Sequence, residues 1–226
     1  MDPRHGPLFK YLRREHLAAF TSAGTVRIGT LHEYHAIDRL GEHIGDSEEG
    51  MVFCLVRRED LLRIGADVSA CGPLAEWVRN MVRKSPEARL FEHFFANYMA
   101  RDQYAYCVTG TYNEEAMRQF GYDACLRIDN PLGFFGCISE DIRERAIPGA
   151  LFRCQYRDRL FRYDEADAIH PESVKTPRYA YQNEVRALWG SRVPWSPDFH
   201  PIDNPAPVLA PMLVSDPRLI PFCTPM

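Results

Sequence analysis

A short segment near residue 184 carries the residue types and the spacing best suited to chemistry. It reads Tyr181-Gln182-Asn183-Glu184-Val185-Arg186. Side chains two positions apart share one face of a β-strand, so a strand over residues 178–189 would align Gln182, Glu184 and Arg186. We therefore take the Glu184 carboxylate as the centre of a candidate catalytic group. The alternative is a solvent-facing polar strand on which Glu184 and Arg186 form a weak surface pair.

Two histidines and a glutamate near residue 32 are the only other obvious ligand group. His32, Glu33 and His35 fall one residue short of the HExxH zinc motif, so we interpret them as surface residues and predict no metal site. The sequence contains no GxxxxGK[ST] or GxGxxG phosphate loop and no GxSxG elbow. None of its cysteines has a catalytic sequence context. Glu184 therefore remains the residue best suited to catalysis.

The first sixty residues supply the elements that would stand opposite Glu184. The pattern predicts a strand over 8–12, a helix over 13–23 ended by Gly24 as a left-handed cap, and a strand over 25–31. Residues 32–50 have no regular period and read as a long loop with one helical turn, followed by a strand over 51–56. The acidic stretch 45–50 is either a solvated turn or a mobile flap beside a cleft.

Residues 72–101 read as a helical hairpin, packed on a sheet or inserted as a cap over a cleft. A Ser85-Pro86 pair would start the second helix. The apolar residues at helical spacing are Leu74, Trp77, Val78, Met81 and Val82, then Leu90, Phe91, Phe94, Phe95 and Tyr98.

The remaining segments alternate strand and helix patterns before a proline-rich end. We predict strands over 103–109 and 122–128, helices over 113–120 and 139–145, and a hairpin pairing 151–156 with 160–163. Nine of the 17 prolines fall from Pro194 onward, so we expect an irregular, extended tail. Its anchors would be Val208, Leu209, Met212 and Leu213.

Together these elements predict the fold class and the domain organisation. The class is α+β, with a mixed, mainly antiparallel split sheet and the helical hairpin packed on one side. Residues 1–193 form one catalytic-type domain that contains the insertion 72–101, and residues 194–226 form the tail.

The order of these motifs resembles the ADP-ribosyltransferase superfamily. That family carries a basic residue with an aromatic neighbour on its first strand, matched by Lys10-Tyr11, and a polar position on a following strand, matched by Thr30 with Tyr34 nearby. Its late catalytic glutamate is matched by Glu184. Residues 8–190 are also similar to a large bacterial family with an opening Lys-Tyr strand and a late Glu-x-Arg strand. The sequence departs from the transferases in having Lys10 where Arg or His is commoner, and in lacking a Ser-Thr-Ser stretch after Thr30.

The resemblance implies an enzyme that uses NAD⁺ as a substrate, held between two small antiparallel sheets. Glu184 would stabilise the oxocarbenium-like state formed when the nicotinamide–ribose bond breaks, and Gln182 would orient the acceptor. The implied NAD-binding residues are Lys10, Tyr11, Thr30, Tyr34 and Arg186.

Several roles fit such a domain. The implied activity is that of a glycosyltransferase of the pentosyl class, acting as a toxin or a phage-defence effector on a macromolecular or small-molecule acceptor. One alternative is a non-catalytic binding or interaction module on the same scaffold. Another is a nucleic-acid-processing enzyme that uses the Glu184/Arg186 face with the acidic loop.

Composition limits the partners and the compartment. The 226 residues include 46% hydrophobic and 26% charged residues, as in ordinary globular proteins, and the net charge of −4 gives no global attraction to nucleic acid. Local basic clusters at 13–14, 57–58, 79–84 and 157–162 are solvated faces or points of nucleic-acid contact. Seven scattered cysteines without a CxxC pair indicate free thiols and a reducing compartment. With no signal peptide and no long apolar run, we expect a cytoplasmic protein without a membrane partner.

Overall fold

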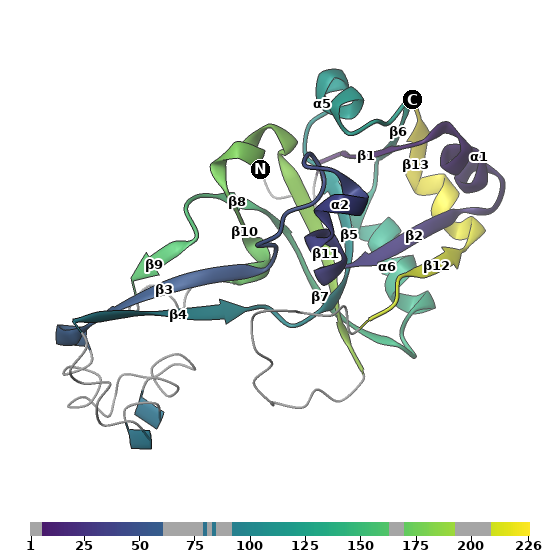
Figure 1. Ribbon diagram of the computed structural model, residues 1–226. Coiled ribbons are helices and arrows are strands. Elements are labelled where there is room, and N and C mark those ends of the chain that lie inside the picture. The colour runs from purple at the N-terminus through teal and green to yellow at the C-terminus, as the bar shows by residue number, and fades with distance from the viewer. Residues whose placement is uncertain (1–5, 61–78, 81–82, 85–91, 163–169, 193–208) are drawn as a thin grey trace.

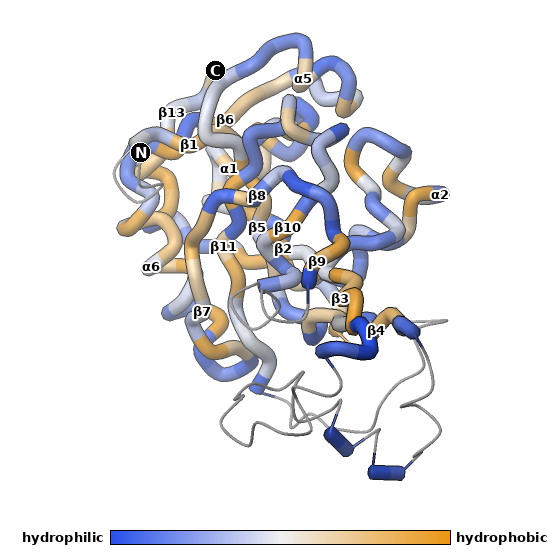
Figure 2. The backbone as a smooth tube through the Cα atoms, turned by 90° about the vertical axis from the view of Figure 1, so that its left-hand side faces the viewer, coloured by the Kyte–Doolittle hydropathy of each residue, from blue (hydrophilic) through white to orange (hydrophobic). Residues whose placement is uncertain are grey.

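The computed structural model describes residues 6–60, 79–80, 83–84, 92–162, 170–192 and 209–226. Within these residues the fold is α+β, as predicted, with an eight-stranded sheet and two smaller sheets (Figure 1). Hydrophobic stretches lie on the strands at the centre, and many of the surrounding turns are hydrophilic (Figure 2). No helix in this part of the chain has both the length and the apolar character needed to cross a membrane.

The main sheet is antiparallel at every described pairing and divides at its central strand, β5. One edge of β5 pairs along its whole length with β11, and the other edge is shared between β2 and β1. Its strands are β1 (Leu8–Leu12), β2 (Thr25–Thr30), β5 (Gln103–Thr109), β6 (Ala124–Ile128), β7 (Ala146–Arg153), β11 (Glu184–Ser191), β12 (Met212–Ser215) and β13 (Cys223–Pro225).

The opening strand–helix–strand unit forms as predicted. Helix α1 (Arg14–Ala23) ends at Gly24, whose φ of 65° is left-handed. A Cβ on Gly24 would lie 1.9 Å from the Asp216 carbonyl oxygen, so glycine is required there both for its backbone conformation and for space. The unit places β1 and β2 against the same edge of β5.

The hydrophobic core lies between the main sheet and helices α1, α6 (Pro131–Asp141) and η5 (Pro217–Phe222). Its fully buried side chains include Phe20, Ile28, Leu126, Phe134 and Leu219. The sequence placed a helix over 139–145 instead of α6. The helix starts earlier because the Asn130 side chain caps the backbone N–H of Gly133 and Pro131 occupies the first turn.

The two small sheets lie beside the main one. One is a ribbon of β4 (His93–Met99), β3 (Met51–Arg57) and β9 (Leu160–Arg162), which extends away from the main sheet (Figure 1). The other pairs β8 (Gln155–Tyr156) with β10 (Val174–Lys175). The predicted hairpin of 151–156 with 160–163 is therefore wrong, because β7, β8 and β9 pair with β11, β10 and β3.

The predicted second helix of the 72–101 hairpin is also wrong over 93–99, where the chain forms β4. Its aromatic residues fit a helical spacing, but aromatic side chains also favour strands, and the open edge of β3 offers seven paired positions. Residues 79–80 and 83–84 are helical, and the rest of 61–91 lies outside the described residues.

The described end of the chain is more regular than its prolines suggested. Strand β12 pairs with β2, and β13 pairs with β6, so residues 212–225 extend two edges of the main sheet. Leu209 and Met212 are buried as predicted, whereas Leu213 is 75% exposed. Val208 lies outside the described residues.

The remaining elements are short and connect these layers. They are η1 (His32–His35), α2 (Ile37–Leu40), α5 (Glu114–Gln119), η3 (Pro171–Ser173) and η4 (Pro177–Gln182). The predicted strand over 178–189 therefore begins only at residue 184, because η4 precedes it and Asn183 takes a left-handed conformation with φ of 41°.

Candidate functional site

The register of the main sheet brings the Lys10-Tyr11 motif close to Glu184. On β5, Thr109 pairs with Phe9 of β1 on one side and with Glu184 of β11 on the other. Lys10 and Tyr11 follow Phe9, so they lie across β5 from Glu184. A cavity of about 100 Å³ lies at this junction.

Five of the seven predicted site residues line this cavity. They are Lys10, Tyr11, Tyr34, Gln182 and Glu184. Glu184 is only 7% exposed and belongs to the cavity wall, so the alternative of a solvent-facing polar strand does not hold. Gln182 belongs to η4 rather than to the strand, yet its side chain still reaches the same cavity.

Thr30 and Arg186 do not line the cavity, which corrects their expected contact with a ligand. Thr30 is fully buried, and its hydroxyl accepts a hydrogen bond from the backbone N–H of Glu33 at 3.2 Å. Arg186 is also fully buried and lies behind Glu184, with its Nε 2.6 Å from Glu184 Oε1. Their positions assign Thr30 to a turn and Arg186 to the support of the carboxylate.

Two residues outside the predicted catalytic and NAD-binding sets complete an ionic cluster at the site; one of them, Glu49, belongs to the acidic stretch 45–50. The Lys175 Nζ lies 2.5 Å from Glu184 Oε2 and donates to Gln182 Oε1 at 2.7 Å. Glu49 takes both terminal nitrogens of Arg186, at 2.6 and 2.7 Å. We call Glu49, Lys175, Glu184 and Arg186 the ionic cluster; its two carboxylates and two cations balance in charge.

The ionic cluster keeps both carboxylates ionised. Burial alone would raise the pKa of Glu184, but the charges of Arg186 and Lys175 outweigh it and hold that pKa well below its usual range. The pKa of Glu49 is lowered for the same reason, against the effect of burial. Glu184 is therefore a fixed negative charge at neutral pH and is not suited to donating a proton.

The acidic stretch 45–50 is not a solvated turn, because two of its carboxylates are buried in ion pairs. Asp46 and Glu49 are 1% and 0% exposed. Asp46 pairs with the guanidinium of Arg159 at 2.5 Å, and Arg159 also donates to the backbone carbonyl of Met51 at 2.9 Å. Arg159 belongs to the sequence cluster 157–162 but is itself buried, so it contributes nothing to a basic surface.

Lys10 lies on the opposite wall without a carboxylate partner among the described residues. Its Nζ donates to the backbone carbonyl of Cys107 at 2.8 Å and lies 4.7 Å from the centre of the Tyr106 ring. Burial lowers the pKa of Lys10, and the negative charge of Glu184 offsets part of this effect. A half-buried ammonium without a carboxylate partner favours an anionic ligand.

Aromatic side chains form the rest of the wall. Phe9, Tyr11, Phe120 and Tyr122 line the cavity, and the rings of Tyr11 and Phe120 lie 6.0 Å apart. The Tyr11 hydroxyl accepts from the backbone N–H of Asn113 at 2.6 Å, which fixes the ring. The cavity thus has one ionic wall and one aromatic wall, an arrangement suited to a ligand with both charge and a flat ring.

His32 and His35 each form a hydrogen bond to a backbone carbonyl. His32 Nε2 bonds the carbonyl of Ala100 at 2.9 Å, and His35 Nε2 bonds that of Glu49 at 2.5 Å. Glu33 pairs with Arg27 at 2.5 Å. Across the described ranges, no three His, Cys, Asp or Glu side chains converge in a way that could hold a metal ion.

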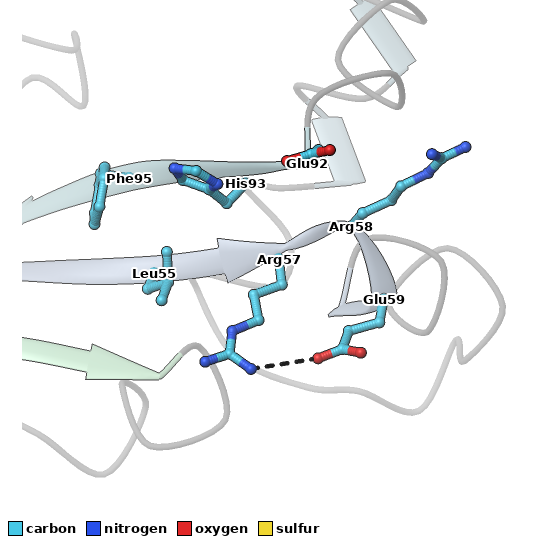
Figure 3. A pocket seen from close by; sticks show the side chains of 7 residues that line it. All are labelled: Leu55, Arg57, Arg58, Glu59, Glu92, His93 and Phe95. Carbon is cyan, nitrogen blue, oxygen red and sulfur yellow. Dashed lines mark ion pairs between the residues drawn. The ribbon is translucent and has the colours of Figure 1, made fainter.

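A larger and more open hollow of about 550 Å³ lies at the far ends of β3 and β4. Arg57, Arg58, His93 and Phe95 line it, and the side chain of Arg58 extends away from the Arg57–Glu59 pair (Figure 3). That pair is exposed and its closest atoms are 3.6 Å apart. The hollow contains none of the predicted site residues and no buried charge, so we place the candidate site at Glu184.

Comparisons with known proteins identify no relative, so the candidate function rests on the geometry of the site. No protein-family model matches the chain, and neither the curated proteins nor the solved structures provide a match.

We expect the free energy of unfolding to fall as the pH drops below about 6.5. Burial lowers the pKa of His35 below that of a free histidine. As the pH falls, His35 is therefore protonated in the unfolded chain before it is protonated in the folded one, and the folded state loses stability. A second loss should follow below pH 4.5, where the unfolded carboxylates of Glu49 and Glu184 protonate before the folded ones. Urea unfolding at pH 7.5, 5.5 and 4.0 measures both steps. A His35→Gln variant should lack the first step; a decline of equal size in that variant would contradict the assignment to His35.

Proposed function

We propose that the cavity binds NAD⁺ and that the chain is an ADP-ribosyltransferase-like enzyme. The observation that carries the proposal is the convergence of Lys10, Tyr11, Tyr34, Gln182 and Glu184 on one cavity, although they span the chain from residue 10 to residue 184. The resemblance to the ADP-ribosyltransferase superfamily implies a role for these five residues at one NAD⁺ site. Such an activity would suit a toxin or a phage-defence effector.

The ionised Glu184 suits the proposed reaction. When the nicotinamide–ribose bond breaks, its electron pair leaves with nicotinamide and positive charge develops on the ribose. A carboxylate beside the ribose stabilises this charge, and more so where water is excluded. Arg186 and Lys175 each hold one oxygen of Glu184, which fixes the orientation of the carboxylate before the substrate arrives.

The opposite wall suits the rest of the dinucleotide. NAD⁺ carries a diphosphate, and the Lys10 ammonium supplies a charge that its phosphates can neutralise. The nicotinamide is a flat ring, and Tyr11, Tyr34 and Phe120 offer surfaces against which it can pack.

Two measurements on the unmodified protein test the proposal. Calorimetric titration with NAD⁺ should show binding, and chromatography of the incubated mixture should show nicotinamide release. Labelled NAD⁺ in a cell lysate should then reveal the acceptor. If the folded protein gives neither binding nor release, the transferase proposal is wrong.

Replacing Lys10 with methionine should weaken NAD⁺ binding by roughly 10- to 100-fold, because hydrogen bonds to charged groups contribute more than neutral ones. Methionine keeps the length and the apolar stem of the side chain but removes its charge. Calorimetry measures the change, with Arg127→Met as the control, because Arg127 pairs with Asp129 away from the cavity. Equal NAD⁺ affinity in Lys10→Met and the wild type would show that Lys10 does not contribute to NAD⁺ binding.

A non-catalytic binding module is the second candidate, and one observation favours it. Both oxygens of Glu184 already contact cations, Arg186 and Lys175, so the carboxylate also satisfies a purely structural role. On this account the cavity would bind a ligand without breaking it. Binding of NAD⁺ without nicotinamide release would favour this second account.

A further inference from the structure

One side of the cavity is formed by a short loop that follows α2. His43 and Ile44 of this loop line the cavity. We refer to residues Gly41–Gly45 as the covering loop. Its behaviour decides how any ligand reaches Glu184.

The covering loop is firmly fixed at both ends. Before it, the backbone N–H of Gly41 donates to the carbonyl of Ile37 in α2 at 2.7 Å. After it, Asp46 forms its buried ion pair with Arg159, and its N–H donates to the carbonyl of Tyr34 at 2.8 Å. Any movement of the loop is therefore confined to the residues between these two points.

The middle of the covering loop is held to η4 by three hydrogen bonds and no described ion pair. Gln182 Nε2 donates to the carbonyl of His43 at 2.7 Å, and the Tyr179 hydroxyl donates to the carbonyl of Gly45 at 3.0 Å. The His43 ring and the Tyr181 hydroxyl are joined at 3.3 Å. Each such bond adds little net stability, because water replaces it when it breaks.

Gly41 gives the loop a point about which it can turn. Its φ of 77° and ψ of 162° belong to a region that is open essentially to glycine alone. A Cβ at this position would meet no atom within 4 Å, so the space around the backbone is open. The turn is defined by this backbone conformation and by the hydrogen bonds that the Gly41 carbonyl accepts from the N–H groups of Ile44 and Gly45, at 3.2 and 2.8 Å.

The size of the cavity requires one wall to move. Pockets for drug-sized ligands have volumes of roughly 300–1,000 Å³, and a dinucleotide is at the upper end of such ligands. The cavity has about 100 Å³, enough for a few water molecules or one small ring. The strands and the ionic cluster cannot yield without breaking sheet pairing or buried ion pairs, whereas the covering loop can.

We propose that Gly41–Gly45 is a lid that turns about Gly41 to admit the ligand, and that Gln182 is its latch. The other end of the Gln182 amide accepts from Lys175, which pairs with Glu184. Opening the lid thus releases one end of a hydrogen-bonded chain that reaches the carboxylate. The need for the cavity to open rests on the proposed NAD⁺ ligand, whereas the labelling of the lid variants below tests the lid without any ligand.

Cys107 provides a direct measure of lid opening. It lines the cavity and is half-buried, and burial raises its pKa to about 12, so its thiol reacts slowly at neutral pH. The rate of N-ethylmaleimide labelling of Cys107, followed by peptide mass spectrometry at fixed pH, should rise roughly 5- to 10-fold in Gln182→Ala, as expected when one hydrogen bond is lost. Gly41→Ala should raise it independently, because alanine resists the closed backbone conformation.

Controls separate lid opening from general loosening. Ser139→Ala removes the hydrogen bond from the Trp189 indole to the Ser139 hydroxyl, which lies outside the cavity lining, and should leave the Cys107 rate unchanged. The buried Cys54 and Cys154 should stay unlabelled in every variant. The lid proposal is wrong if both lid variants label Cys107 at the wild-type rate. It is also wrong if the labelling of Cys54 and Cys154 rises in parallel with that of Cys107.

Adding NAD⁺ separates the lid from the proposed function. If NAD⁺ is the ligand, it should slow the labelling of Cys107 in the wild type by occupying the cavity. Faster labelling in the lid variants without protection by NAD⁺ would support the lid and count against NAD⁺ as the ligand.

Discussion

Replacing Glu184 with glutamine should cut nicotinamide release from NAD⁺ by roughly 100-fold or more, the usual loss when one electrostatic group of a transition state is removed. The amide keeps the shape of the carboxylate but not its charge. Affinity for NAD⁺ should fall much less, because the negative charge is needed chiefly while positive charge develops on the ribose. Nicotinamide release at saturating NAD⁺, together with calorimetric affinity, measures the two effects separately.

The ionic cluster affects how this experiment must be done. Without the charge of Glu184, the cluster retains Glu49 against Lys175 and Arg186 and carries one excess positive charge. Glu184→Gln should therefore also lower stability, and rates should be compared at a temperature where circular dichroism shows both proteins folded. Glu33→Gln is the matched control, because Glu33 is a buried, arginine-paired carboxylate outside the cavity lining. Equal losses of release in the two variants would show that stability, not chemistry, explains the effect.

Replacing Arg186 with methionine should cost about 3–5 kcal/mol of the free energy of unfolding, the usual consequence of leaving a buried charge without its partner. Arg186 is fully buried and makes contacts with Glu49, Glu184 and the carbonyl of Glu172. Its loss leaves two buried carboxylates with Lys175 as their one remaining partner in the ionic cluster. Domains of this kind are stable by only about 5–15 kcal/mol, so the variant should lie close to unfolding at 25 °C.

Urea unfolding curves measure this loss, and two further variants test its cause. Arg118→Met removes an exposed arginine that pairs with Glu114 and should change stability little. Combining Arg186→Met with Glu49→Gln restores the charge balance, so the double variant should lose less than the sum of its single variants. An Arg186→Met protein as stable as Arg118→Met would show that the ionic cluster does not support the fold.

The sequence by itself determined the local elements around the site. Val26 and Ile28 are buried on either side of the exposed Arg27, as the alternation at the start of this strand predicted. Gly24 marks the helix end because only glycine fits its backbone angle and its contact with Asp216. The same period places Glu184 and Arg186 on one face of β11, where their side chains bond. These predictions succeeded because they depend on neighbours within a few residues.

The tertiary structure alone decided which charges are buried. Lys175 carries no sequence signal that sets it apart from surface residues. Glu49 belongs to an acidic stretch whose burial the sequence does not show, and it lies 137 positions from the arginine that it binds. The sequence left the acidic stretch 45–50 open between a solvated turn and a flap beside a cleft for the same reason. Its burial depends on Arg159 and Arg186, which approach only after β9 and β11 take their places in two different sheets.

Tertiary structure also decided between helix and strand where the local pattern fitted both. The aromatic residues of 93–99 have a helical spacing, but pairing with β3 satisfies their backbone groups and fixes them as a strand. At the end of the chain, β12 and β13 form because β2 and β6 present open sheet edges to them. Proline density along a segment does not reveal whether such an edge will be available, because the partner strand lies far away in the sequence.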